Sequence, residues 1–302
     1  MPSFAFDTLN IYVLLTLASW SIWGILDKKA LDNAKYTDVV LRYSMWCVVS
    51  IPLIYLLLNF TQPNWHIHPS TWFWTSLGAL FSTVAIMCYM ASMTKTEASY
   101  VLGITSAYPL ILQFLAVPLL GEKLVVDRLL GAACIAAGVG AIGASPGGDA
   151  PFPTGKERWQ LIALIVVCVI TWGVWGIFDK KAIETATPLE AYFAERVWEI
   201  ATLFVVFGWC RWRKIPIDLK NKPAWTYTFL NWAALAVGRY AYFGALLLAS
   251  ASYVITITGC YPLLMYFFAI VFLKEKFNKL RFVGIGLVVI GGILVQITRD
   301  VQ

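Results

Sequence analysis

The chain has 302 residues and a formal net charge of +6, and 60% of its residues are apolar while only 13% are charged. Its mean hydropathy is +0.72. Soluble domains average about 45–50% apolar and about 25% charged residues, so these values exclude a water-soluble globule and predict an integral membrane protein. The positive charge does not indicate a nucleic-acid partner, because the lysines and arginines lie in short connectors between apolar runs, as in multi-span proteins.

Ten apolar runs follow one another, each matching the roughly 20 residues with which a helix crosses the hydrocarbon core. The first residues, "MPSFAFDTLN", lack the basic region of a cleaved signal peptide, so we expect the first run to remain as a helix. The sequence therefore predicts an all-α integral membrane protein with ten transmembrane helices. These lie at about 10–30, 37–59, 71–93, 98–120, 125–144, 159–180, 188–209, 225–248, 251–273 and 280–298.

The second half of the chain repeats the first. "WGILDKKA" (23–30) returns as "WGIFDKKA" (175–182) with seven of eight positions identical, and residues 98–123 match residues 251–276 without gaps at 14 of 26 positions. A unit with an odd number of spans enters the membrane in opposite senses when it is duplicated. We therefore predict two inverted five-helix repeats, 1–148 and 149–302, an arrangement typical of alternating-access transporters.

Several of these repeated motifs also resemble a known family. The tryptophan pair of "SWSIWG" recurs in the second half, and "YP" followed by "GEK" or "KEK" marks each fourth and fifth helix. In these features the whole chain is similar to the EamA family of the drug/metabolite transporter (DMT) superfamily. The resemblance implies a transporter whose fourth helix in each half contributes to a central cavity.

From the repeat and the resemblance we expect a secondary transporter that moves a small polar metabolite by alternating access across the cytoplasmic (bacterial inner) membrane. An amino-acid-like or other anionic or zwitterionic solute is the expected substrate class, with protons as a candidate coupling ion. The alternatives are a flippase for a lipid-linked precursor or headgroup and a non-transporting membrane scaffold. We expect no enzyme activity, no cofactor, no metal and no nucleic-acid partner. The expected partner besides the substrate is membrane lipid, and the expected oligomeric state is a monomer or a homodimer.

Among the charged side chains of the predicted spans, the candidates for a functional role are Arg42, Glu195, Arg196, Glu199 and Arg239. Burying a charge at membrane mid-depth costs at least about 2.5–3.5 kcal/mol on insertion scales, so each should be paired or bind a ligand. In one interpretation Arg239 neutralises a glutamate of the seventh helix as a structural bridge. In the other, Arg239 receives a carboxylate or phosphate of the substrate, since its fork suits oxyanions, while a glutamate binds a proton or an amine.

Aromatic, hydroxyl and proline residues also recur in both halves. Either packing or cavity lining accounts for the central tryptophans, and either a static bend or a gate accounts for the prolines, which break helix hydrogen bonds. The candidate lining residues are Trp20, Trp23, Trp172, Trp175, Tyr100, Thr105, Tyr108, Tyr253, Thr258 and Tyr261, and the candidate kinks are Pro109 and Pro262. "GAACIAAGVGAIGA" and "GIGLVVIGG" indicate close helix packing through small residues. The repeated Asp-Lys-Lys is interpreted as a mark of the membrane surface.

The orientation of the chain is open. With Arg42, Arg196 and Arg239 set aside, the odd-numbered connectors, which share one side of the membrane, carry 15 Lys and Arg. The other side, with both termini, carries 5. The positive-inside rule then places the termini outside, whereas the family resemblance implies termini inside.

We expect residues 211–222 to lie in the cytoplasm, because this connector alone holds five basic residues. Single cysteines placed in it should resist a membrane-impermeant thiol reagent in intact cells and react after permeabilisation. Labelling in intact cells would reverse the orientation.

Overall fold

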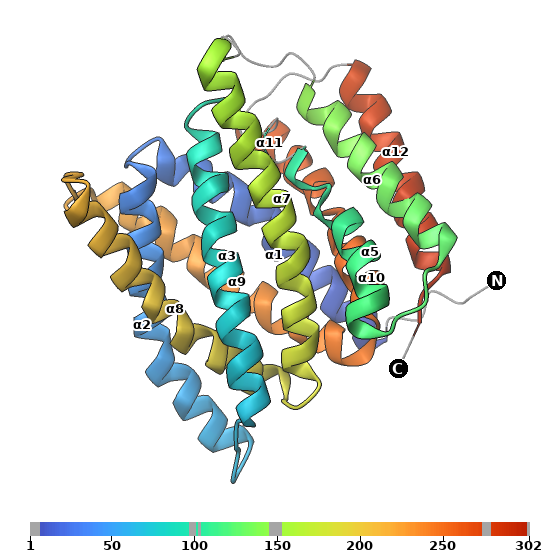
Figure 1. Ribbon diagram of the computed structural model, residues 1–302, viewed down its shortest axis with the longest axis horizontal. Helices are drawn as coiled ribbons and strands as arrows, with labels where there is room; N and C mark the ends of the chain where they lie inside the picture. The colour runs from blue at the N-terminus through green and yellow to red at the C-terminus, as the bar shows by residue number, and fades with distance from the viewer. Residues whose placement is uncertain (1–6, 97–100, 102–103, 145–152, 274–278, 301–302) are drawn as a thin grey trace.

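The chain folds as a bundle of α-helices (Figure 1). The computed structural model describes residues 7–96, 101, 104–144, 153–273 and 279–300. Within these residues the fold is all-helical and has ten helices when each interrupted helix is counted once, which confirms the predicted fold class. The helices are α1 (Thr8–Leu31), α2 (Tyr36–Thr61), α3 (Pro69–Met93), α5 (Tyr108–Leu120), α6 (Val126–Ala144), α7 (Gly155–Ile183), α8 (Pro188–Trp212), α9 (Lys222–Leu248), α10 (Ala251–Thr258), α11 (Tyr261–Leu273) and α12 (Lys279–Ile297).

Side chains that cap free backbone N–H groups fix where several helices begin. Asp7 accepts a hydrogen bond from the backbone N–H of Asn10 at the start of α1. Arg299, after α12, also pairs with Asp7 and lowers the pKa of its carboxyl, so the two chain ends meet. α8 begins with a capping box between Thr187 and Glu190.

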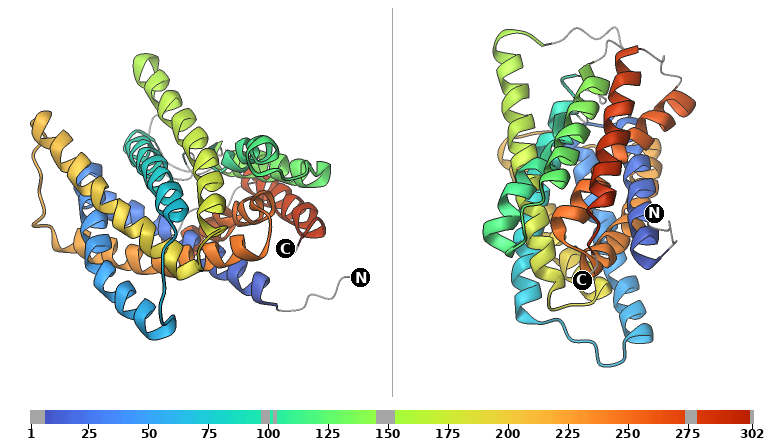
Figure 2. Two further views of the ribbon diagram at one scale, coloured as in Figure 1. Left: turned by 60° about the horizontal axis from the view of Figure 1, so that its bottom comes forward. Right: turned by 90° about the vertical axis from the view of Figure 1, so that its right-hand side faces the viewer.

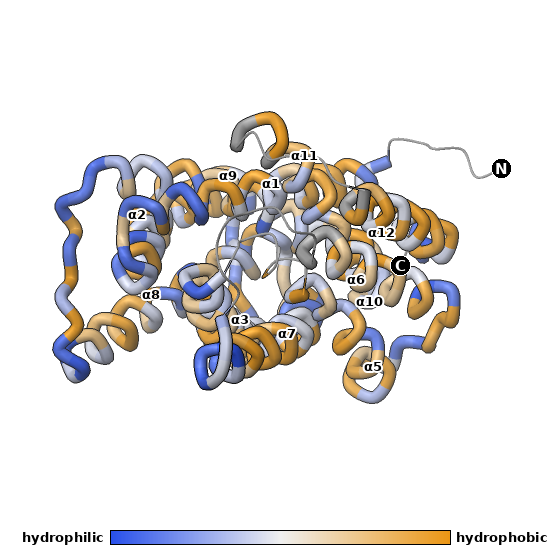
Figure 3. Tube along the Cα trace, turned by 90° about the horizontal axis from the view of Figure 1, so that it is seen from above, coloured by the Kyte–Doolittle hydropathy of each residue, from blue (hydrophilic) through white to orange (hydrophobic). Residues whose placement is uncertain are grey.

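The two halves pack together along their whole length. α1 packs against α9 and α3 against α7, while α2 pairs with α8 and α6 with α12 (Figures 1 and 3). Because α7, α8, α9 and α12 repeat α1, α2, α3 and α6, these pairings are exchanged between the halves. In Figure 1, α1 rises toward the upper left, whereas α7 begins at the top and ends at the bottom, and Figure 2 shows the same bundle from two further sides.

Many large apolar side chains, among them Phe60, Phe204 and Phe282, are exposed on the surface of the bundle, and Figure 3 shows hydrophobic residues along most of the helices. Five helical segments of the described chain are long and apolar enough to cross a membrane, namely Thr8–Leu31, Tyr36–Thr61, Pro69–Met93, Gly155–Ile183 and Ala251–Phe268. These spans indicate a multi-pass membrane protein.

The fourth helix of the second half is interrupted rather than bent. Gly259 and Cys260 form a turn between α10 and α11, and Pro262 is the second residue of α11. In the first half Pro109 occupies the same place in α5, after a turn at residues 106–107. Proline fits the first turn of a helix because its missing N–H has no intrahelical acceptor there. Whether these breaks act as gates stays a prediction.

α6 and α12 approach each other closely through glycines, as the small-residue motifs predict. A Cβ on Gly138 would lie 2.6 Å from the carbonyl oxygen of Gly284, and one on Gly291 would lie 2.6 Å from that of Gly131. The two contacts are related by the repeat, since Gly131 and Gly138 correspond to Gly284 and Gly291. Only glycine permits this backbone contact.

We expect Gly138→Val to lower the free energy of unfolding by about 1–3 kcal/mol, because the new side chain overfills the α6–α12 contact. Gly140→Val is the matched control, since a Cβ there meets nothing within 4 Å. Thermal unfolding in detergent should show a lower midpoint for the first variant only. Equal midpoints would contradict the tight contact.

Candidate functional site

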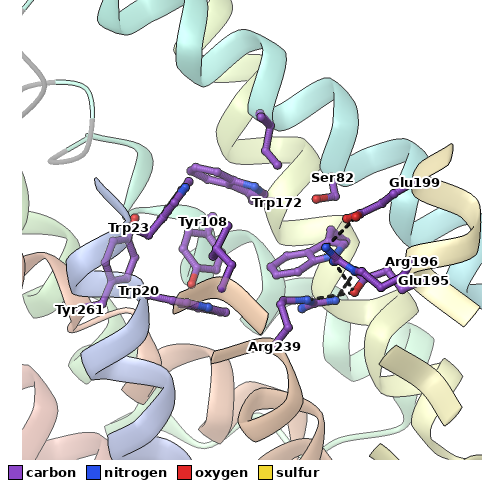
Figure 4. A pocket seen from close by; sticks show the side chains of 13 residues that line it. Trp20, Trp23, Ser82, Tyr108, Trp172, Glu195, Arg196, Glu199, Arg239 and Tyr261 are labelled. Atoms are coloured by element: carbon purple, nitrogen blue, oxygen red, sulfur yellow. Dashed lines mark hydrogen bonds and ion pairs between the residues drawn. The ribbon is translucent and has the colours of Figure 1, made fainter. Parts of the chain in front are cut away.

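A cavity with about 640 Å³ of empty space lies between helices of both halves (Figure 4). A second chamber of about 630 Å³ adjoins it and shares Trp23, Arg196 and Glu199 in its lining. In Figure 4 the side chains on one side of the cavity include Trp20, Trp23, Tyr108, Trp172 and Tyr261, and those on the other include Glu195, Arg196, Glu199 and Arg239. The first chamber is lined by Trp20, Trp23, Ser82, Ile86, Tyr108, Trp172, Trp175, Glu195, Arg196, Glu199, Leu235, Arg239 and Tyr261.

Part of the aromatic side is a three-ring cluster built on Tyr242 of α9. The ring centroid of Tyr242 lies 5.2 Å from that of Trp20 (α1) and 5.6 Å from that of Trp175 (α7). Tyr242 is fully buried, and its ring is nearly parallel to that of Trp175. The cluster therefore ties the first helix of each half to α9.

The inverted repeat generates a second three-ring cluster from the corresponding residues. Tyr89 of α3, the counterpart of Tyr242, lies 5.1 Å from Trp23 and 5.4 Å from Trp172. The two clusters have the same composition and exchange the roles of α1 and α7. Aromatic pairs at these separations contribute beyond the area they bury.

Two further ring contacts are related to each other by the repeat. Tyr108 lies 5.9 Å from Trp172, and Tyr261 lies 5.9 Å from Trp20. Both tyrosines precede the prolines of the interrupted helices. The structure thus brings together the repeated tryptophans and the "YP" tyrosines around one cavity.

Arg239 lies among carboxylates from two other helices. Its Nε donates to Glu195 Oε2 at 3.1 Å, its Nη2 pairs with Glu195 Oε1, and its Nη1 donates to Asp179 Oδ2 at 3.0 Å. The guanidinium also lies 4.5 Å from the centroid of the Trp175 ring and 4.6 Å from that of Phe243. In this conformation all three nitrogens of Arg239 are already engaged by the protein.

Arg196 links Glu195 and Glu199 of α8. Its Nη2 pairs with Glu195 at 3.0 Å, and its Nη1 pairs with Glu199 at 2.6 Å and donates to the Cys47 sulfur at 3.3 Å. With Asp179, this network holds three carboxylates and the two guanidiniums of Arg196 and Arg239. When every group is ionised, the network carries one negative charge in excess.

Arg42 lies away from this cavity. It is buried, its Nη2 donates to the backbone carbonyl of Asp218 at 2.8 Å, and its guanidinium lies 5.5 Å from the ring of Trp225. It therefore joins α2 to the connector before α9.

The remaining candidates also lie outside both chamber linings or outside the described residues. The hydroxyl of Tyr253 donates to Gln296 at 2.7 Å. Thr105 and Thr258 are buried and donate to carbonyl groups of their own helices, Val101 at 2.9 Å and Val254 at 2.8 Å. Tyr100 falls in residues 97–100, which lie outside the described part of the chain.

The Asp-Lys-Lys motifs lie in the last turns of α1 and α7, and their position at the membrane surface stays a prediction. Asp27 and Asp179 are 0% and 1% exposed. Lys180 is also buried, and its ammonium donates to the carbonyls of Leu246 at 2.7 Å and Ala249 at 3.0 Å, where it caps the end of α9. Its counterpart Lys28 is instead partly exposed and pairs with Asp32, so only the aspartates share their burial between the two motifs.

Tyr89 and Tyr242 were not predicted as site residues. Each lies eleven residues before the tyrosine of an "ASY" motif, so the repeat contained the signal. The surrounding residues differ between the halves, which hid the correspondence.

Comparison with known proteins agrees with this geometry. A sequence profile described as the EamA-like transporter family matches residues 8–144 and 159–297. A solved structure titled only "Crystal structure of protein" superposes with a TM-score of 0.73, covers 96% of each chain and is 15% identical, which shows the fold alone. No curated protein matches the chain. The boundary predicted between residues 148 and 149 falls outside the described residues.

We expect Arg239→Leu to lower the free energy of unfolding by about 3–5 kcal/mol, because it leaves Asp179 and Glu195 as buried carboxylates without this partner. Arg213→Leu, at an exposed position after α8, is the control and should change it by no more than about 0.5 kcal/mol.

Adding Asp179→Asn and Glu195→Gln to Arg239→Leu should restore most of the stability, since the unpaired charges are gone. Thermal unfolding of all variants in detergent measures both effects. A stable Arg239→Leu single variant would show that the ion pairs contribute little to the fold.

Proposed function

The chain belongs to the EamA-like transporter family, and from its cavity we infer that it transports a small, amine-bearing, amino-acid-like solute. As a member of this family it is a transporter and not an enzyme. The proposal concerns the substrate class, the alternating-access cycle and the bacterial cytoplasmic membrane as the setting. The observation that carries it is the excess carboxylate opposite a wall of tryptophan and tyrosine rings.

An ammonium group fits between these two sides of the cavity. Glu199 lines both chambers, and its side chain is 16% exposed, which makes it the most accessible of the three carboxylates. Tryptophan and tyrosine faces attract cations, and the attraction is stronger when the cation has lost its water. An amine without a carboxylate, bound at Glu199, would also neutralise the network's excess charge.

A carboxylate on the same solute would be received by Arg196 rather than by Arg239. The Nε atom of Arg196 is buried without a hydrogen-bond partner, and Arg196 lines both chambers. Arg239, in contrast, already engages Glu195 and Asp179. A zwitterion would thus replace the Arg196–Glu199 pair with two ion pairs of its own. A purely anionic solute is disfavoured, because it would meet the excess negative charge.

The symmetry of the aromatic clusters supports alternating access. Trp20 and Trp23 on α1 and Trp172 and Trp175 on α7 each contact the opposite half. Rocking of one half against the other would separate contacts at one end of the cavity and retain the related contacts at the other. The breaks before α5 and α11 supply backbone at which such movement can occur.

We expect wild-type protein in proteoliposomes to take up amino-acid-like zwitterions or amines from a labelled panel that also contains organic acids and a lipid-linked precursor analogue. Glu199→Gln should reduce this uptake about 10–100-fold, because a hydrogen bond to a charged group contributes about 1.5–3 kcal/mol. Glu184→Gln is the matched control, since this glutamate is exposed and pairs with Lys181.

Two results would overturn the proposal. One is full amine or zwitterion uptake by Glu199→Gln. The other is transport of acids or of the lipid-linked analogue alone, and the latter would favour the flippase alternative.

A further inference from the structure

The first-half counterpart of Asp179 lies in a different chemical setting. We propose that Asp27, Tyr43 and Asn231 form a proton-binding site that couples transport to proton movement. The coupling rests on the proposed transport function, whereas proton binding at the site does not.

Within the described residues, the carboxyl group of Asp27 is hydrogen-bonded only by neutral groups. Asp27 is 0% exposed, and its Oδ1 accepts hydrogen bonds from the Tyr43 hydroxyl and from Asn231 Nδ2, each at 2.6 Å. Asn231 also contacts the Tyr43 hydroxyl. A buried carboxylate without a cation is costly, and such a group lowers its free energy by taking up a proton.

The elements packed against α1 present hydroxyl groups to Asp27. Tyr43 belongs to α2, while Tyr89 of α3 and Tyr261 of α11 lie within electrostatic range. On α9 the facing group is the amide of Asn231. Tyr253 of α10 instead donates to Gln296 of α12.

The nearby cations are committed elsewhere. On α1 itself, Lys28 pairs with Asp32 at 3.1 Å, and Lys29 lies over the ring of Tyr227 at 5.9 Å. Arg42 of α2 bonds to the carbonyl of Asp218, and Arg239 of α9 binds carboxylates of the second half, as described above.

The Asn231 amide can serve both protonation states of Asp27. The separation of 2.6 Å is short for an N–H···O bond and ordinary for an O–H···O bond. Amide nitrogen and oxygen are assigned from their surroundings, and both Asn231 Oδ1 and Asp27 Oδ2 lack a hydrogen-bond partner. With its NH₂ toward Asp27 the amide donates to a carboxylate, and after a half-turn its oxygen accepts from a protonated carboxyl.

Tyr43 connects this site to the cavity. It is partly exposed and lines the second chamber, together with Arg196 and Glu199. A hydronium ion in that chamber would give its proton to Asp27 beside the Tyr43 hydroxyl. One O–H bond of the hydronium ion breaks and leaves a water molecule, one O–H bond forms on the carboxyl, and the Asn231 amide turns to accept it. Tyr43, which bonds to Asp27, and the proposed substrate site therefore line one chamber.

The corresponding site in the second half, around Asp179, has different polar partners. Tyr43 corresponds to Glu195 and Asn231 corresponds to Gly78 in the repeat. A Cβ on Gly78 would lie 3.3 Å from Asp179 Oδ1, so the two aspartates meet matching positions of the opposite half. Asp179 has Arg239 as a fixed cation, whereas Asp27 has two neutral hydrogen-bond donors.

Infrared spectra of the full-length protein in lipid nanodiscs, recorded across a pH titration, test the proton site without any substrate. We expect a carbonyl band of a protonated carboxylic acid that Asp27→Asn removes. Asp179→Asn, the matched control, should retain it. Tyr43→Phe should shift both the band and its pH midpoint, and it keeps the test decisive where Asp27→Asn does not fold.

A band unchanged in Asp27→Asn, or unchanged in Tyr43→Phe, would overturn the site. Coupling is tested separately in proteoliposomes that transport the amine and contain a pH-sensitive dye. Wild-type protein should move protons with the solute and Asp27→Asn should not. Solute uptake by the wild type without proton movement would overturn the coupling and leave the proposed transport function standing.

Discussion

Lipid hydrocarbon offers no hydrogen-bonding partner, so a charged side chain within the membrane must find an opposite charge or polar groups inside the protein. Arg239 on α9 meets this requirement with Glu195 of α8 and Asp179 of α7, and Arg196 then joins Glu195 to Glu199. Three helices of the second half are held together in this way. The cavity lies where this network faces the aromatic rings, and its polarity is therefore confined to one side.

The duplication preserved the apolar part of the site and changed the polar part. The rings that contact Tyr89 and Tyr242 correspond residue by residue, because packing between the halves requires the same shapes at both ends. The charged partner of Asp179 has no charged equivalent, since Arg239 corresponds to Ile86. A shared aromatic framework thus carries two different electrostatic environments.

The sequence predicted the helices to within a few residues, because apolar runs and their connectors determine them directly. It did not predict the interruption at Gly259 and Cys260, since the apolar run continues through the break. Most cavity-lining residues were found because they are charged or repeated. The burial of Asp27 and Asp179 was missed because both lie near helix ends, where covering by helices of the opposite half decides exposure. Tyr242 was missed because its neighbours differ from those of Tyr89.

A carrier that reorients both with and without its solute must keep its membrane charges neutralised in both states. The two electrostatic environments meet this requirement in different ways. A charge that crosses a region of low dielectric constant unpaired adds to the barrier. The pairs of Arg239 remain within the second half and need no ligand to stay neutral. Glu199 exchanges Arg196 for the proposed amine, and Asp27 exchanges charge for a proton. Glu199 and Asp27, whose environment changes during the proposed cycle, can therefore change partner or charge. Arg239, which keeps its charge, stays paired throughout.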